Sequence, residues 1–280
     1  MSEQYDEPTI RRILVALDAS RYSLAALEAA IELAAGLEAE LQGIFVEDVN
    51  LLRAAGSPAA REVQYPFVAG ARLDRKRMER EMRAQAAQAR QSLVAACEHL
   101  QVKWSFRVVR GEVAPEVLAA ALGADLLSLG KASRPLVRRP RMGSTARAAA
   151  SRAPKSVFLL QRDVGIQPPV MVTYDGSPLA WQALRIAAHL ARRKGGCLIV
   201  LVVAGTSDEE YRLQAETADW LRQQGVLIRY RRLARASAAL LTRQVQSEGG
   251  GVLVLGATLL PPGALQTLLD GMDCPVLLVR

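Results

Sequence analysis

The sequence predicts an α/β protein built from two tandem, doubly wound parallel sheets. Short apolar runs typical of buried strands alternate with helical patterns along all 280 residues, and this alternation favours parallel strands joined by right-handed crossovers. The segment 170–203 repeats the segment 13–46 without a gap, which indicates an internal duplication. We therefore expect one domain at residues 1–162 and a second, shorter domain at residues 168–280, joined by a linker that contains glycine and proline.

The first half has the order of elements expected of such a sheet. A polar turn at 18–20 separates the first strand from an amphipathic helix that ends near Gly36, as turn residues and a glycine stop commonly do. The segment 73–100 has the longest helical pattern, and the segment 47–70 before it is expected to be a long loop. Further helices are expected at 115–122 and 146–153, and strands at 12–17, 41–46, 102–110, 125–129 and 156–160.

The second half keeps the pattern of a sheet but has a shorter loop after its fourth strand. Gly263 follows Gly256 by only seven positions, and prolines rather than basic residues lie between them. This half therefore lacks the length and the charge of a phosphate-binding loop. Its strands are expected at 170–174, 198–203, 226–232, 252–255 and 274–279, with helices at 208–224 and 236–248.

The segment from Gly130 to Thr145 has the composition of an anion site. It begins at the carboxyl end of an expected strand and contains no acidic residue. Gly143, Ser144 and Thr145 then open a short helix, where free backbone N–H groups and the helix dipole favour a phosphate. The alternative interpretation is a solvated basic loop with an ordinary helix cap. The basic residues of the loop are Lys131, Arg134, Arg138, Arg139 and Arg141.

Asp18 and Val46 follow the first two strands and are expected at the same edge of the sheet. Ligands of doubly wound sheets bind beyond the carboxyl ends of the strands, where the strand order reverses. If the first and fourth strands flank that point, Asp18 and Gly130 lie on either side of one crevice. Asp18 can then accept a hydrogen bond from a ribose hydroxyl, and the backbone around Val46 can contact a flat base. The alternative role for Asp18 is a carboxylate that caps a turn or a helix.

These residues resemble the nucleotide-binding pattern of the universal stress protein family in its tandem two-domain form, and the resemblance covers nearly the whole chain. After the fourth strand, the family's pattern is a glycine, two residues, a second glycine, nine residues, and then a glycine followed by serine or threonine. Gly130, Gly143 and Ser144 have this spacing, and Ser133 stands at the place of the second glycine. The second half resembles the degenerate, non-binding domains of tandem members.

The resemblance implies a Rossmann-like fold of the adenine nucleotide alpha hydrolase type, with strand order 3-2-1-4-5 in each half. It also implies that the first half binds ATP or a related adenine nucleotide, with Mg²⁺ bound through the phosphates. Asp18 would contact the ribose, and the backbone of Val46 would contact the adenine. The other expected contacts are Ala16 and, around the phosphates, Gly130, Ser133, Gly143, Ser144 and Thr145.

The resemblance further implies that the two halves pack about a pseudo-twofold axis. The closing strands near Val157 and Val276 would pair, so that one chain would supply within itself the dimer that single-domain members form between chains. The sequence leaves open whether whole chains form a homodimer, and it does not identify the protein partner.

Composition argues against several classes of protein. The net charge is +8 and the pI is near 9.8, but no lysine-rich tail or basic patch interleaved with aromatic residues supports nucleic-acid binding. No apolar run approaches the roughly 20 residues that span a bilayer, and residues 1–10 lack the apolar core of a signal peptide. The three cysteines lie far apart, which argues against a disulfide or zinc framework and fits a reducing, cytoplasmic location.

The sequence shows no recognisable catalytic constellation. Lys131 is not part of a Walker loop, because the upstream glycine and the following Ser or Thr are missing. Ser20 and Ser177 have no histidine at a recognisable spacing, and His99 and His189 fall within helical patterns. The leading hypothesis is therefore a non-enzymatic stress-response regulator that binds an adenine nucleotide. The alternatives are an interaction module that uses the basic loop to bind an acidic partner, and slow hydrolysis of the bound nucleotide.

Overall fold

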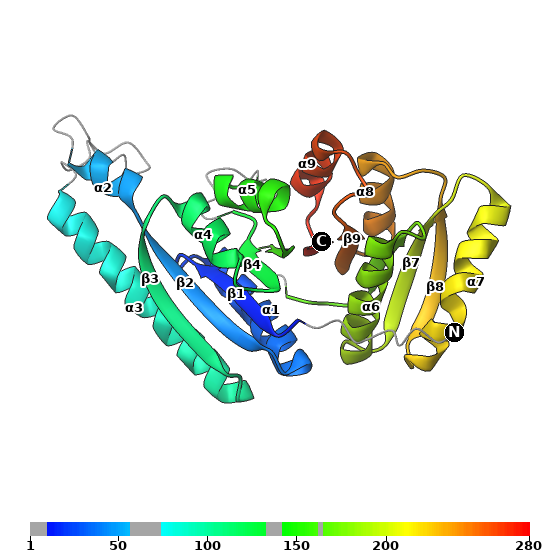
Figure 1. Ribbon diagram of the computed structural model, residues 1–280, viewed down its shortest axis with the longest axis horizontal. Helices are drawn as coiled ribbons and strands as arrows, with labels where there is room; N and C mark the ends of the chain where they lie inside the picture. The colour runs from blue at the N-terminus through cyan, green and yellow to red at the C-terminus, as the bar shows by residue number, and fades with distance from the viewer. Residues whose placement is uncertain (1–9, 57–73, 133–141, 162–164) are drawn as a thin grey trace.

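A computed structural model describes residues 10–56, 74–132, 142–161 and 165–280. The described strands form one ten-stranded sheet in the order β3-β2-β1-β4-β5-β10-β9-β6-β7-β8, with the first half on the left of Figure 1 and the second on the right. The strands are β1 (Arg12–Leu17), β2 (Glu40–Asp48), β3 (Trp104–Gly111), β4 (Leu126–Gly130), β5 (Ser156–Leu160), β6 (Val170–Tyr174), β7 (Cys197–Val203), β8 (Leu227–Leu233), β9 (Val252–Gly256) and β10 (Val276–Val279). The predicted order 3-2-1-4-5 is confirmed in each half, and the two expected sheets are continuous with each other.

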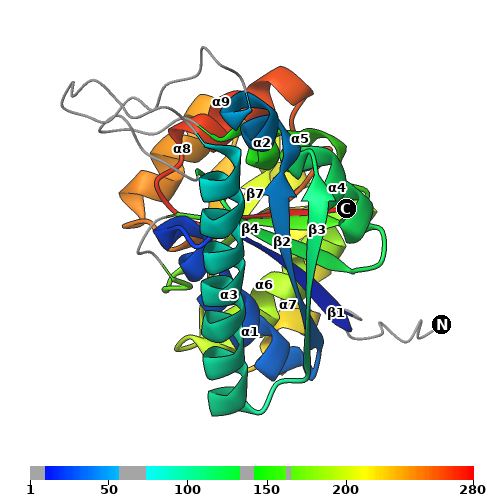
Figure 2. The same ribbon diagram turned by 90° about the vertical axis from the view of Figure 1, so that its left-hand side faces the viewer.

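The helices cover both faces of this sheet. Buried residues of α1, α3, α6 and α7 pack in one core, and those of α4, α5, α8 and α9 pack in a second core on the opposite face. Figure 2 shows α3 lying lengthwise along β2 and β3. The helices are α1 (Arg21–Leu37), α2 (Val49–Ala55), α3 (Arg75–Leu100), α4 (Val113–Ala121), α5 (Ser144–Arg152), α6 (Pro178–Arg193), α7 (Ser207–Gln223), α8 (Ala238–Ser247) and α9 (Pro262–Gly271).

Two helices differ from the sequence-based expectation. The segment expected as a loop from residue 47 begins with α2, whose first turn is capped by Asp48 through a hydrogen bond from the Asn50 N–H at 2.8 Å. The second is α9, which follows the short loop of the second half. Its sequence is only ten residues long and contains two glycines, so its helical propensity is low and burial of Leu268 and Leu269 stabilises it instead.

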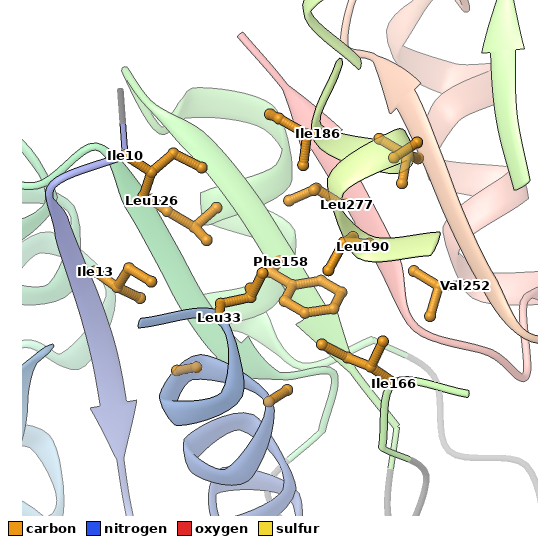
Figure 3. Packing of buried hydrophobic residues seen from close by; sticks show 14 of the residues in the cluster. Ile10, Ile13, Leu33, Leu126, Phe158, Ile166, Ile186, Leu190, Val252 and Leu277 are labelled. Carbon is orange, nitrogen blue, oxygen red and sulfur yellow. The ribbon is translucent and has the colours of Figure 1, made fainter. Parts of the chain in front are cut away.

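The two halves meet where β5 and β10 pair in antiparallel register. Val157 lies opposite Leu278, and Leu159 lies opposite Val276, so the expected pairing of the closing strands is confirmed. Both strands are buried along their whole length. Figure 3 shows Phe158 packed among side chains from both halves, and each of the two cores runs across the junction without a break.

Reciprocal hydrogen bonds reinforce this junction on either side of the pseudo-twofold axis. Gln161, after β5, donates from Nε2 to the carbonyl of Met272, which ends α9, at 2.9 Å. Arg280, after β10, donates to the carbonyls of Ala150 and Ala153 at the end of α5. Each half therefore caps the last helix of the other.

Candidate functional site

A pocket of about 1020 Å³ opens at the carboxyl ends of β1, β2 and β4. Its described lining comes from the ends of these strands, from the amino-terminal turns of α1, α2, α4 and α5, and from one side of α3. Because β2 and β4 lie on opposite sides of β1, the pocket is at the point where the strand order reverses. This is the position at which doubly wound sheets bind ligands.

The structure brings most of the expected site residues to this one pocket. Its lining includes Ala16, Asp18, Val46, Gly130, Ser144 and Thr145. Gly143 is not part of the lining. It precedes α5, and its N–H donates to the Lys131 carbonyl at 2.8 Å. Ser133, Arg134, Arg138, Arg139 and Arg141 lie outside the described residues.

Asp18 has both a structural contact and a position in the pocket. Its Oδ1 accepts a hydrogen bond from the Ser20 N–H at 3.0 Å, which closes the turn after β1. The side chain is exposed to the pocket, and the described residues provide no hydrogen-bond partner for its Oδ2. One carboxylate oxygen is thus fixed by the turn, and the other can accept from a ligand.

Val46 lies where β2 extends past β1. The last paired residues of these two strands are Leu17 and Phe45, whereas the pairing of β2 with β3 continues to Asp48. The side of the Val46 backbone that faces β1 is therefore open to the pocket. A flat group with hydrogen-bonding edges could pair there as a further strand would.

Gly130 is explained by packing alone. A Cβ on Gly130 would lie 2.6 Å from Cβ and 2.8 Å from the carbonyl carbon of Tyr22, so glycine is what allows α1 to lie against β4. Gly256, at the equivalent place in the second half, faces Leu179 in the same way at 3.2 Å. This glycine of the motif therefore serves the fold whether or not a phosphate binds beside it.

The amino end of α5 has the features of an anion site. Its N-cap is Gly143, which has no side chain to cap the helix, and its first turn contains no acidic residue. Within the described part of the chain, the N–H groups of Ser144 and Thr145 have no hydrogen-bond partner. By contrast, α1 is capped by Ser20 and α2 by Asp48. The amino end of α4 also has no side-chain cap, but its first turn contains Glu116. At α5, the positive end of the helix dipole is left for a ligand to neutralise.

The expectation that Lys131 adds positive charge to this pocket is wrong. The residue is only 4% exposed, and its Nζ donates to the carbonyls of Met272 at 2.6 Å and Asp270 at 3.3 Å in the second half. Burial lowers the pKa of the Lys131 ammonium, and the carboxylates of Asp273 and Asp270 oppose that shift. Lys131 thus binds the carboxyl end of α9, where a cation is favourable.

Several lining residues were not predicted from the sequence. Arg21 is the one basic residue in the described lining, which also contains the acids Asp48 and Glu112. Glu112 precedes α4, whose first turn reaches the pocket because it follows the carboxyl end of β3, so the same strand-end reasoning could have found it. No local signal in α3 identifies Met82, Gln85 and Gln88 as lining residues.

Different contacts are present at the equivalent place in the second half. Leu213 of α7 packs on Gly176, so that a Cβ there would lie 2.9 Å from Leu213 Cδ2. Arg232 of β8, the counterpart of β3, donates to the carbonyls of Ala204 and Gly205, which follow β7. A leucine and a guanidinium therefore occupy the strand ends that border the pocket in the first half.

Among the described residues, no group of three or more His, Cys, Asp or Glu side chains is placed to hold a metal ion. In the same residues, no helix combines the length and the apolar character needed to cross a membrane.

The family model described as the universal stress protein family matches residues 9–161 and 168–254. A universal stress protein from Archaeoglobus fulgidus has a similar structure through both halves. It aligns with 97% of this chain over 99% of its own length, with a TM-score of 0.72 and 14% sequence identity, a likeness that shows a shared fold. None of the curated proteins compared with this chain matches it significantly.

Two solved structures of the same family, each aligned with about half of this chain, contain an adenine nucleotide. One is a universal stress protein in complex with cAMP, with 19% identity, a TM-score of 0.37, and coverage of 55% of this chain and 98% of its own. The other is a family protein from Arabidopsis thaliana with AMP bound, with 14% identity, a TM-score of 0.38, and coverage of 55% and 92%. Because the family model matches both halves, the present chain belongs to the universal stress protein family and carries two of its domains in tandem.

Proposed function

We propose that the first half binds ATP or a related adenine nucleotide and that the protein acts in the cytoplasm as a non-enzymatic, nucleotide-responsive stress regulator. The observation that carries this proposal is the convergence of Asp18, Val46 and the uncapped end of α5 on one pocket at the reversal of strand order. Membership of a family in which some proteins bind adenine nucleotides makes this the ligand class to test.

Each part of the nucleotide has a matching group in the pocket. The free Oδ2 of Asp18 accepts a ribose hydroxyl, and the open backbone edge at Val46 meets the adenine. The N–H groups of Ser144 and Thr145 donate to phosphate oxygens at the positive end of the α5 dipole. Mg²⁺ would be carried by the phosphates, since the described residues offer no metal site of their own.

We propose domain limits of 1–162 and 168–280, with nucleotide binding confined to the first. The second domain has Leu213 and Arg232 at the strand ends that border the pocket in the first, and its loop after β9 is short and contains no basic residue. It supplies the pairing partner of the first domain instead of a second ligand site.

Ser144→Glu separates phosphate recognition from folding. Ser144 is exposed in the first turn of α5, where a carboxylate stabilises a helix by about 0.3–1 kcal/mol but repels an anion. In titration calorimetry with AMP, ADP and ATP, we expect the variant to lose at least about tenfold in affinity, whereas adenosine should bind as it does to the unaltered protein. Gly263→Glu, in the first turn of α9, is the matched control and should not change any affinity.

Asp18→Asn tests the ribose contact without opening the turn, because the amide oxygen can still accept from the Ser20 N–H. Losing a hydrogen bond to a charged acceptor costs about 1.5–3 kcal/mol, so adenosine and all three nucleotides should bind more weakly. Asp175→Asn is the control, since Asp175 closes the equivalent turn of the second half by accepting from Ser177 N–H at 3.0 Å. If no adenine compound binds the unaltered protein, while an acidic protein is captured at low salt, the interaction module replaces this proposal.

A further inference from the structure

The two chain segments that flank the phosphate end of the pocket are joined to each other. Lys131, directly after β4, donates its backbone N–H to the Leu160 carbonyl of β5 at 2.8 Å. Its own carbonyl accepts from the N–H of Gly143, the N-cap of α5, also at 2.8 Å. Ala132 and Ser144, the next residues on either side, line the pocket. The position of the α5 amino end is therefore set by the backbone at Lys131.

Both flanking segments are also bound to one place in the second half, the carboxyl end of α9. On one side, Lys131 Nζ donates to the carbonyls of Asp270 and Met272. On the other side, the buried Met142 donates its backbone N–H to Asp270 Oδ1 at 3.1 Å. The second carboxylate oxygen of Asp270 accepts from Gln266 Nε2 at 2.9 Å, which holds the carboxylate in place on α9.

These bonds differ in location from the other contacts between the halves. Gln161 and Arg280 connect strand ends with helix ends near the pseudo-twofold axis, and Lys194 pairs with Glu32 at 2.8 Å on the other face of the sheet. Among the described contacts, those of Lys131 and Met142 are the ones that reach the residues next to the pocket lining.

We propose that the second half positions the phosphate-binding end of the first, with Lys131 and Asp270 as the positioning residues. This inference rests on the proposed function for its ligand, and it gives the second domain a role in binding although it offers no site. Coupling between two parts of a protein is reciprocal. A nucleotide that binds the α5 amino end therefore stabilises the carboxyl end of α9. Conversely, a change that loosens α9 lowers the affinity for the nucleotide.

Hydrogen exchange on the full chain without ligand tests the anchoring by itself. Asp270→Ala removes the acceptor of the Met142 N–H, so we expect faster exchange at Met142 and Gly143, by about tenfold. Asp270→Asn keeps an Oδ1 acceptor and should restore the slow exchange. Lys194→Met, which removes the ion pair on the opposite face, is the control and should leave these amides unchanged. Equal exchange in Asp270→Ala and the unaltered protein overturns the proposal.

Nucleotide titrations of the same variants test the coupling. Asp270→Ala and Lys131→Met should each lower the affinity for AMP and ATP by about tenfold. Asp270→Asn should recover most of this loss, and Lys194→Met should bind both nucleotides with unchanged affinity. In the unaltered protein AMP should slow exchange at Leu268 and Leu269 of α9, and in Lys131→Met it should not.

The two proposals fail in different ways. Faster exchange in Asp270→Ala with unchanged AMP affinity overturns the coupling and leaves the nucleotide site in place. If the unaltered protein binds no nucleotide, the proposed function is overturned together with the coupling, and the exchange rates of the ligand-free variants still decide whether α9 anchors the pocket.

Discussion

Ala19 adopts a backbone conformation that the equivalent residue of the second half reaches without strain. Its φ is 57°, in the left-handed region, where Gly176 has a φ of 80°. A residue with a Cβ is disfavoured there by about 1–2 kcal/mol relative to glycine. The turn keeps this shape because the Asp18 carboxylate and the start of α1 both fix it, so the strain lies in the lining of the pocket.

We expect Ala19→Gly to raise the free energy of unfolding by about 0.5–1 kcal/mol, since the relief of strain exceeds the entropy cost of glycine. Gly176→Ala should lower it by a larger amount, because the new Cβ would also lie 2.9 Å from Leu213 Cδ2. Urea denaturation of the two variants measures both effects. A loss of stability in Ala19→Gly would contradict the strain.

Two of the three cysteines are expected to resist ionisation. Burial raises the pKa of the Cys97 thiol from 9.0 to about 11, and burial likewise raises the pKa of Cys274 to about 11. The folded chain therefore keeps both protons between pH 9 and 11, whereas the unfolded chain releases them. The stability that these thiols contribute is complete below pH 9 and is lost as the pH rises towards 11.

The measurement is urea denaturation at pH 8.5 and pH 10.5, with Cys97→Ala as the comparison. The fall in unfolding free energy between the two pH values should be smaller in Cys97→Ala. Lys131 acts in the opposite direction, because its pKa is lowered by burial in the folded state. The comparison with Cys97→Ala isolates the thiol, and an equal fall in both proteins would contradict the assignment.

At the scale of elements, the contact of α1 with β4 depends on a missing side chain. Gly130→Ala would place a methyl group 2.6 Å from Tyr22 Cβ, whereas Gly256→Ala would meet Leu179 Cβ at 3.2 Å. Overpacking of this kind costs about 1–3 kcal/mol. We expect Gly130→Ala to be clearly the more destabilising of the two, as measured by the urea midpoint. Equal costs would mean that α1 moves away freely.

The connection between the second and third strands differs between the two halves. The ends of β1, β2 and β4 are positioned by α1 and α4, as in any sheet of this type, but the first half inserts α2 and α3 between β2 and β3. The second half crosses from β7 to β8 with the single helix α7, which begins at Ser207 and brings Leu213 onto the turn after β6. The longer connection of the first half therefore contributes α2 and α3 to the lining of the pocket.

At the scale of the whole molecule, the two domains share their cores. Phe158 has no exposed surface and packs in a cluster that includes residues of both halves. We expect the chain to unfold in a single calorimetric transition with equal calorimetric and van't Hoff enthalpies. Phe158→Ala should destabilise the protein by about 3–5 kcal/mol and shift the whole transition. Two separate transitions in the unaltered protein would show that the halves fold independently.

Local patterns were sufficient for much of the fold. The strands at 12–17 and 156–160 and the long helix near 75–100 agree with the structure, because uninterrupted apolar runs and a long amphipathic period each favour one type of element. The gap-free repeat indicated two halves of equal topology. The short helix α9 is stabilised by burial of its leucines despite its glycines. Its low helix propensity therefore gave no indication of it.

The candidate site was predicted as a set of strand ends and a helix start. The sequence by itself determined which residues follow β1, β2 and β4 and which amide groups open α5. Only the tertiary structure decided where Lys131 points, that Gly130 is required by Tyr22, and that α3 forms part of the pocket. The physical reason is that sequence spacing fixes backbone position along an element, whereas the direction of a long side chain depends on partners distant in sequence. For Lys131 those partners are two carbonyls about 140 residues away in the other half.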